Sequence, residues 1–443
     1  MSLTRDEAKG IVEQALKLTK AEECSVSLSG GRDANIRFAK NEVTTSGDAE
    51  DAALSVRASF GKRSGSASVN QFDGAALERC VRQAEETARF APEDPEHMSV
   101  LPPQAYREIA AFAEEAGDLA PERRADVAKK AIDLAKARKV VIAGFFTSSG
   151  GFQAIGNSKS LFGYHRQSRL TFSATARTPD AQGSGWAGNN GERPEDVDAI
   201  GLSRAAVEKA FLSAKPRELA PGAYTVILEP AAVADLFLYM GFSMGARPAD
   251  EGRSFFSKKG GGNKIGEKVL SEKVTLWTDP ADPRAPGAPF APDGQATRKM
   301  AFVENGVVTN LDYSRYWAQK QGKEPTPQPQ NIIMKGDTGS LPDLVKDTKK
   351  GVLVTRLWYI RFVDPQTILL TGLTRDGTFA VENGKIRHAV KNFRWNDSPI
   401  SVFSKIDAMT REVRARGSEA EDFSVVCPAI RTQFTFSSLS DAV

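Results

Sequence analysis

Short runs in which apolar and polar residues alternate recur along this chain, and they constrain its fold more than any other feature. Four such runs, SVSL, NIRF, AALSVRASF and KRSGSASV, follow one another between residues 25 and 69, and each is bounded by Gly, Asn or Asp. Alternation with a period of two places the apolar side chains on one face of a half-buried strand. These runs therefore predict a small antiparallel sheet near the N-terminus.

The second half of the chain carries two hairpin signals. AFVENGVVTNL turns at Asn305-Gly306, and FAVENGKIRHAV turns at Asn383-Gly384. Asn-Gly suits a two-residue hairpin turn because both central residues need a positive φ. By contrast, residues 279–294 contain five prolines, which exclude a helix or a central strand there.

Helical patterns are interspersed with these strands. A capping box formed by Thr4 and Glu7 opens the first one. Further helices are predicted over Gly74–Arg89, Pro121–Ala137 and Pro194–Lys215. The small residues 148–151 predict a turn between two strands.

The order of these elements predicts the fold class. Mixed helices and strands come first and a strand-rich half follows, which is typical of an α+β fold with two domains. We expect an N-terminal α+β domain over residues 1–215 and a strand-rich C-terminal domain over residues 216–443.

Composition narrows the class of protein. No apolar run reaches the roughly eighteen residues of a membrane-spanning helix, and the first ten residues lack the apolar core of a secretory signal. Cys24, Cys80 and Cys427 form no C-x-x-C pair, which favours a reducing cytoplasm over a disulfide framework. The net charge is only +3 and no basic stripe stands out, so direct nucleic-acid binding is not expected.

GFSMG, residues 241–245, matches the G-x-S-x-G pattern of serine hydrolases. A nucleophile elbow needs a strand that runs into the motif, whereas a helical apolar pattern precedes Ser243. A catalytic triad would also need a later histidine, and only His388 follows. The pattern favours a helix end at Ser243, and a metal-independent serine hydrolase stays as an alternative.

Two other segments are better explained by structure than by chemistry. The lysine- and glycine-rich run at 258–268 lacks the spacing of a phosphate-binding loop, so it predicts a surface loop. Asp376 beside Arg375 could be a catalytic carboxylate with a charge partner. The following Gly377 instead favours an ordinary turn, which is the preferred interpretation.

The remaining aromatic and histidine residues are also better explained by structure than by chemistry. Tyr313, Tyr316 and Trp317 fit an aromatic helix face in a core. His97 and His165 have no acidic or cysteine neighbours at ligand spacing, so both are interpreted as incidental.

Several longer strings together resemble the TldD/PmbA family of peptidases, whose members have also been described as modulators of DNA gyrase. The strings are FGKRSGSASVNQFD, EGRSFFSKKGGGNKIGEKV, PQPQNIIMKGDTGSLPDLV, TGLTRDGTFAVENGKIRHAVKNFRWNDSPISVF and CPAIRTQFTFSSLSDA. The resemblance covers most of the chain, and its longest string is specific.

The resemblance implies where a metal site would lie. In TldD-type subunits a helix carries H-E-x-x-x-H, whose imidazoles share a zinc ion while the glutamate acts as general base, and a later cysteine completes the site. Those positions fall on or near Phe237, Leu238 and Phe242 in this chain, and all three are apolar. Cys427 falls downstream of the family's ligand cysteine, so that role is not carried over.

This departure resembles the PmbA branch, also called TldE. It implies a metal-free partner subunit in a cytoplasmic heteromer with a TldD-type metallopeptidase that acts on unfolded peptides. No catalytic, cofactor-binding or metal-ligating residue is assigned to this chain, and no cofactor is expected. A homodimer without that partner and a gyrase-associated binding protein stay as alternatives. Whether the chain has activity of its own, and whether Phe237–Phe242 faces the core, the partner or the peptide, is left open.

Overall fold

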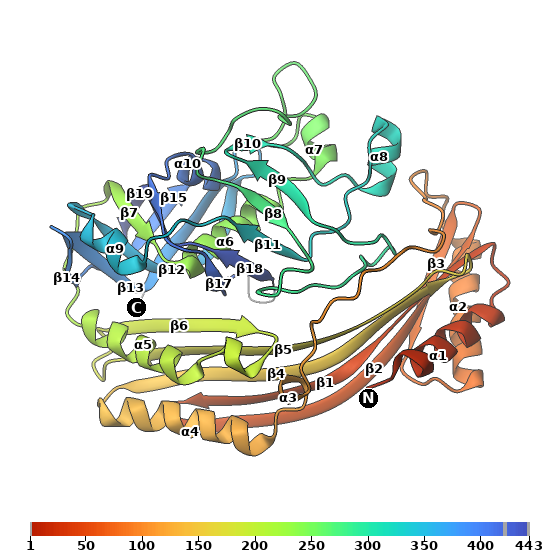
Figure 1. The fold of residues 1–443 in the computed structure, drawn as a ribbon, viewed down its shortest axis with the longest axis horizontal. Coiled ribbons are helices and arrows are strands. Elements are labelled where there is room, and N and C mark those ends of the chain that lie inside the picture. The colour runs from red at the N-terminus through yellow and green to blue at the C-terminus, as the bar shows by residue number, and fades with distance from the viewer. Residues whose placement is uncertain (1, 420–422, 441–443) are drawn as a thin grey trace.

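The computed structural model describes residues 2–419 and 423–440. Helices and sheets are both present, which confirms the α+β prediction. Figure 1 shows a long, curved N-terminal sheet with helix α4 (Pro121–Ala137) below it, helix α5 (Ala199–Leu212) overlapping its left-hand part, and a strand-rich C-terminal region above it. The domain boundary between residues 215 and 216 stays a prediction.

The N-terminal sheet has six antiparallel strands in the order β3-β2-β1-β4-β5-β6. These are β1 (Glu23–Ala39), β2 (Glu42–Phe60), β3 (Arg63–Val69), β4 (Val141–Asn157), β5 (Phe162–Arg177) and β6 (Ser184–Gly191).

The strands of this sheet are longer than the sequence predicted. SVSL and NIRF belong to one strand of 17 residues, because the segment between them also pairs with β2 and β4. The turn predicted at residues 148–151 is wrong, since these residues lie inside β4. Their small side chains serve close strand packing instead: a Cβ on Gly31 of β1 would lie 2.4 Å from the carbonyl oxygen of Gly150.

Side chains of the central strands alternate between two faces of the sheet. Even-numbered apolar residues of β1, β2, β4 and β5 pack against helices, with α1 and α2 at one end and α4 and α5 at the other. Odd-numbered side chains point toward the C-terminal region, where Arg169 Nη2 donates to Ser424 Oγ at 2.9 Å. The helices are α1 (Arg5–Leu18), α2 (Gly74–Phe90), α3 (Glu114–Gly117), α4 (Pro121–Ala137) and α5 (Ala199–Leu212).

The predicted helices are confirmed with one correction. The capping box of Thr4 and Glu7 opens α1, and α2 and α4 occupy their predicted ranges. The helix predicted from Pro194 is instead a short 3₁₀ turn (Pro194–Asp196) followed by α5. Asp198 causes the break, because its carboxylate accepts from Gly201 N and so caps a new helix.

The C-terminal region contains two further sheets. One has the order β12-β7-β19-β15-β13-β14, and an additional pairing of β12 with β13 closes five of its strands into a ring. The other has the order β10-β9-β8-β11-β18-β17. The strands are β7 (Gly222–Leu228), β8 (Leu276–Thr278), β9 (Met300–Glu304), β10 (Val307–Val308), β11 (Asn331–Met334), β12 (Lys350–Asp364), β13 (Leu369–Glu382), β14 (Lys385–Ala389), β15 (Phe393–Asp397), β16 (Ala408–Met409), β17 (Val413–Ala415), β18 (Ser424–Cys427) and β19 (Ile430–Leu439).

Helix α6 (Pro230–Gly241) contacts both of these sheets, through β7 and β12 of one and through β17 and β18 of the other. Its side chains are apolar nearly all round, as expected for a helix enclosed in a core. The remaining helices are α7 (Ala246–Asp250), α8 (Arg315–Gln321), α9 (Leu341–Lys346) and α10 (Pro399–Ser404).

Both predicted hairpins are confirmed. Asn305 and Gly306 have φ values of 49° and 82° between β9 and β10, and Asn383 and Gly384 have 50° and 73° between β13 and β14. The proline-rich segment 279–294 contains neither helix nor strand, as predicted.

The turn predicted at Asp376 is wrong. Asp376 lies in the middle of β13 with a φ of 53°, and Gly377 follows with a φ of 129°. The pairing register with β12 shifts between Val354 and Arg356, close to these two residues. The Asp-Gly pair therefore produces an irregularity within a strand rather than a chain reversal.

At this irregularity the Asp376 carboxylate is buried and links neighbouring strands through hydrogen bonds. Asp376 is 2% exposed and accepts hydrogen bonds from Arg356 Nε at 2.9 Å, from Arg356 Nη2, and from Ser184 Oγ of β6. The Arg356 guanidinium also lies 4.9 Å from the ring centre of Trp186 and 5.1 Å from that of Trp358. Since Ser184 and Trp186 belong to β6, this cluster joins the N-terminal sheet to the C-terminal region.

Removal of the carboxylate should therefore destabilise the whole fold. Asp376→Ala leaves the buried Arg356 without its counter-charge, and we expect the free energy of unfolding in urea to fall by about 3–5 kcal/mol. Ser184→Ala is the matched control, since it removes one hydrogen bond and should cost about 1 kcal/mol. Equal losses for the two variants would contradict this account.

Candidate functional site

Three adjoining hollows follow one another from the N-terminal sheet to helix α6 of the C-terminal region, and together they form what we call the groove. The polar hollow has a volume of about 410 Å³, the middle hollow about 450 Å³ and the apolar hollow about 290 Å³. The polar and middle hollows share Ser29 and Gln153, and the middle and apolar hollows share Gln328, Pro329 and Phe423.

Helix α6 forms one wall of the apolar hollow. Phe237 is fully buried and stacks on Phe403 with ring centres 4.6 Å apart, whereas Phe242 at the helix end is 68% exposed. Phe237, Leu238 and Phe242 all line the apolar hollow. The three positions that the resemblance assigns to metal ligands and base therefore lie together on the groove wall.

Two buried groups fix α6 in place. Asp235 is 0% exposed and accepts hydrogen bonds from Ser418 N (3.1 Å), Ser418 Oγ (3.0 Å) and Glu419 N (2.8 Å). Cys427 of β18 donates its thiol to the carbonyl of Pro230 at 3.4 Å, and burial raises the pKa of this thiol well above its usual value. Both contacts hold α6 against the sheet that contains β18.

Glycines form the floor of the polar hollow. Gly31 of β1 and Gly151 of β4 lie opposite each other, and Asp51 of β2 and Gln167 of β5 continue the same row across the sheet. No side chain therefore rises from the two central strands in this row. The depression follows directly from the side chains that these two glycines lack.

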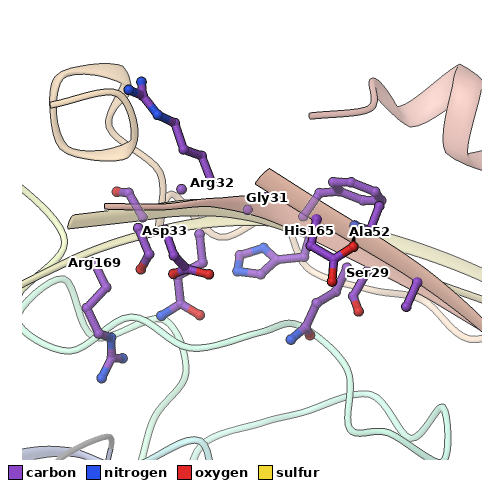
Figure 2. Close-up of a pocket in the computed structure, with 17 residues that line it drawn as sticks. Ser29, Gly31, Arg32, Asp33, Ala52, His165 and Arg169 are labelled. Atoms are coloured by element: carbon purple, nitrogen blue, oxygen red, sulfur yellow. Dashed lines mark hydrogen bonds between the residues drawn. The ribbon is translucent and has the colours of Figure 1, made fainter. Parts of the chain in front are cut away.

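His165 of β5 lies beside this floor. Figure 2 shows its ring between Asp33 and Ser29, whereas Arg32 points to the opposite side of the sheet. The side chain is 6% exposed, and its Nε2 is buried without a hydrogen-bond partner among residues 2–419 and 423–440. Burial lowers the pKa of His165 to about 4, so the imidazole is uncharged at neutral pH. The sequence interpretation of His165 as incidental missed this placement.

The other residues singled out from the sequence do not join the groove chemistry. Ser243 follows α6 and its Oγ donates to the carbonyl of Tyr239 at 3.4 Å, while His388 Nδ1 lies 3.0 Å from the carbonyl of Ala389. Tyr313 and Trp317 are buried in the main C-terminal core, as predicted, whereas Tyr316 packs against that core and is only partly buried.

The lysine- and glycine-rich segment is a loop, as predicted. Three of its glycines, at 260, 261 and 262, have φ values of 97°, 112° and 78°. Two of its lysines have nearby partners: Lys258 lies 3.3 Å from Glu267, and Lys264 lies 3.7 Å from the ring centre of Phe255.

Comparison with known proteins shows that this chain matches one protein family along most of its length. Three family models match in succession: PmbA/TldA metallopeptidase domain 1 over residues 24–88, the central domain over residues 114–213 and the C-terminal domain over residues 221–438. The chain belongs to the PmbA/TldD metallopeptidase family. The resemblance stated from the sequence is thereby confirmed.

Individual relatives agree with this assignment. The metalloprotease PmbA of Escherichia coli O157:H7 is 23% identical over 438 residues, which cover 93% of this chain and 91% of that protein. A metalloprotease of Methanothermobacter thermautotrophicus is 25% identical over 239 residues, and the match spans 50% of this chain and about half of that protein (49%).

Two solved structures show the same fold. TldE from Thermococcus kodakarensis aligns with a TM-score of 0.84 and 19% identity over 98% of this chain and 99% of that one. A Thermotoga maritima protein, described as a candidate modulator of a DNA gyrase, aligns with a TM-score of 0.86 and 20% identity over 97% of this chain and all (100%) of the other.

The family name implies a metal ion, which this chain can hold only if suitable ligand side chains lie close together. In the part of the chain that the structure describes, no three His, Cys, Asp or Glu side chains gather as metal ligands would. On α6 the implied positions hold phenylalanine and leucine, and nearby Cys427 is a buried neutral thiol. Zinc requires deprotonated sulfur, imidazole nitrogen or carboxylate oxygen. The residues present at this helix do not fit a metal ion.

The uncharged state of His165 gives a measurable pH dependence. The unfolded chain protonates His165 near its ordinary pKa of about 6.5, whereas the folded chain does so only near 4, so stability falls as the pH drops below neutrality. Between pH 7 and pH 5, wild type should lose about 2 kcal/mol more unfolding free energy than His165→Gln. Urea unfolding at both pH values measures the difference, and a His165 NMR titration midpoint near 6.5 would contradict the assignment.

Proposed function

We propose that this chain is the metal-free subunit of a cytoplasmic metallopeptidase complex, in which it binds unfolded peptides for a TldD-type catalytic partner. The observation that carries the proposal is the wall formed by Phe237, Leu238 and Phe242. A family helix that would carry ligands and base in a catalytic subunit here presents apolar side chains to a groove.

The groove suits an unfolded peptide. Such a chain offers apolar side chains and unpaired main-chain amides at the same time, so its binding site needs both apolar pockets and polar partners. The apolar hollow supplies the first through Trp277, Phe302 and Phe423, and the polar hollow supplies the second through Gln153 and Gln167.

An exposed apolar patch beside α6 supports a partner chain. Phe242 and Phe362 are 68% and 37% exposed. Buried Tyr239 links the patch, since its ring centre lies 6.1 Å from that of Phe242 and 5.3 Å from that of Phe362. Grouped aromatic residues on a surface are characteristic of protein interfaces.

No helix within the described residues has both the length and the hydrophobicity needed to cross a membrane.

Reconstitution tests the proposal. The purified chain should bind less than a stoichiometric amount of zinc and should not cleave an unfolded protein. Mixed with a TldD-type subunit, it should form a complex that cleaves the same substrate, with about one metal ion per pair of chains and full inhibition by a chelator. Size-exclusion chromatography with metal analysis gives the stoichiometry. The proposal fails if the chain alone binds one equivalent of zinc and hydrolyses the substrate.

The exposed patch gives a second prediction for the same assay. Phe242→Asp places a charge in the proposed interface, so complex formation should weaken by at least about tenfold, because a buried unpaired charge is costly. Val43→Asp is the matched control, since Val43 is also exposed (50%) but lies on the N-terminal sheet. Equal assembly of the two variants would exclude the patch as the contact surface.

A further inference from the structure

We propose that the polar hollow is a binding site for the main chain of an extended peptide, in which His165 supplies a hydrogen bond to a peptide group. The inference rests on the proposed function and deepens it, because it names the substrate contact and the part of the substrate that is recognised.

The floor of the hollow permits close approach of another backbone. Gly31 and Gly151 leave the two central strands bare in one row, and the next rows on either side hold Ser29 with Gln153 and Asp33 with Ser149. Glycine within a strand is typical of places where a ligand or a second chain comes near. The backbone of a peptide that runs along β1 can therefore come close to the sheet at this row, because no side chain rises from it.

The groups around the floor match the chemistry of a peptide unit. Each peptide unit presents one N–H donor and one C=O acceptor. A hydroxyl, a carboxamide and a neutral imidazole can each both donate and accept, and the hollow supplies them as Ser29, Gln153, Gln167 and His165. Such a lining recognises main chain rather than a particular side chain.

His165 is the member of this lining that most clearly lacks a partner. Its side chain is 6% exposed, and its Nε2 has no hydrogen-bond partner in the described part of the chain. Buried polar atoms are almost always paired, so an unpaired one beside a hollow indicates a group that a ligand satisfies. Because burial keeps the ring uncharged, it suits a neutral amide rather than an anion.

The dimensions of the groove suit several peptide residues. The polar and middle hollows together follow β1 from Ser27 to Asp33, and strand geometry makes this distance about 20 Å, or roughly six residues of extended peptide. The groove continues to the apolar hollow, which can accept an apolar side chain of the same peptide.

Binding of a defined probe to the full chain tests this inference. The probe is a fluorescein-labelled peptide of three Gly-Ser-Leu repeats, which avoids acidic residues because Asp33 and Asp51 would repel them. Ser29→Trp places an indole in the polar hollow beside the glycine floor, and His165→Gln removes the imidazole; each should weaken binding about tenfold in fluorescence anisotropy. Thr45→Trp is the control, because Thr45 is exposed on β2 outside the three hollows and should bind as wild type does.

A second arm separates main-chain recognition from a structural effect of the substitutions. A probe methylated on its central amide nitrogens loses main-chain donors, so wild type should bind it about tenfold more weakly, whereas His165→Gln should show a clearly smaller loss. Equal losses in the two proteins would overturn the role of His165. Thermal melting identifies any variant that fails to fold.

The outcomes also separate this inference from the proposed function. If Ser29→Trp and His165→Gln still assemble with the catalytic subunit but lose the probe, the polar hollow is supported. If both bind the probe as wild type does while cleavage still requires both subunits, the hollow is wrong and the proposed function survives. If wild type binds no probe and forms no complex, the proposed function and the inference fail together.

Discussion

The buried contact between Arg356 and Asp376 is the interaction on which the rest of this structure depends. It joins β12 and β13 to Ser184 of β6, so it fixes the N-terminal sheet against the C-terminal region. A buried charge pair contributes little net stability, but it cannot be broken on one side without a large cost. The pair therefore fixes the orientation of the two layers, and the groove between them keeps its shape.

Two features of the strands then determine which side chains line that groove. The period-two alternation of the central strands sends apolar residues to the helices and polar ones to the groove. Glycines that face each other on the paired strands β1 and β4 leave no side chain where the proposed substrate backbone would lie. At the other end, α6 presents Phe237 and Phe242 in place of ligand chemistry. On α6, a fold of the metallopeptidase family thus carries an apolar groove wall where the resemblance places metal ligands.

Much of this architecture was readable from local sequence. Caps, hairpin turns and proline-rich loops depend on neighbouring residues, so Thr4, Asn305 and Asn383 were interpreted correctly. Asp376 was misread because only the pairing with β12 distinguishes a strand irregularity from a turn. The polar hollow could not be predicted, since Gly31 and His165 are far apart in the sequence and meet only through strand register. Family resemblance identified the apolar positions on α6. That they line a groove could be seen only once the three-dimensional structure was known.

The central claim is that an unfolded peptide lies along this groove, from the glycine floor to α6. Photo-crosslinking tests it most directly: an unfolded peptide with a photoreactive phenylalanine analogue is irradiated with the chain, and the attachment sites are mapped by mass spectrometry. The account predicts attachment within residues 27–33 and 237–242, and its suppression by excess unlabelled peptide. Attachment confined to the outer helices α4 and α5, or spread evenly over the surface, would contradict it.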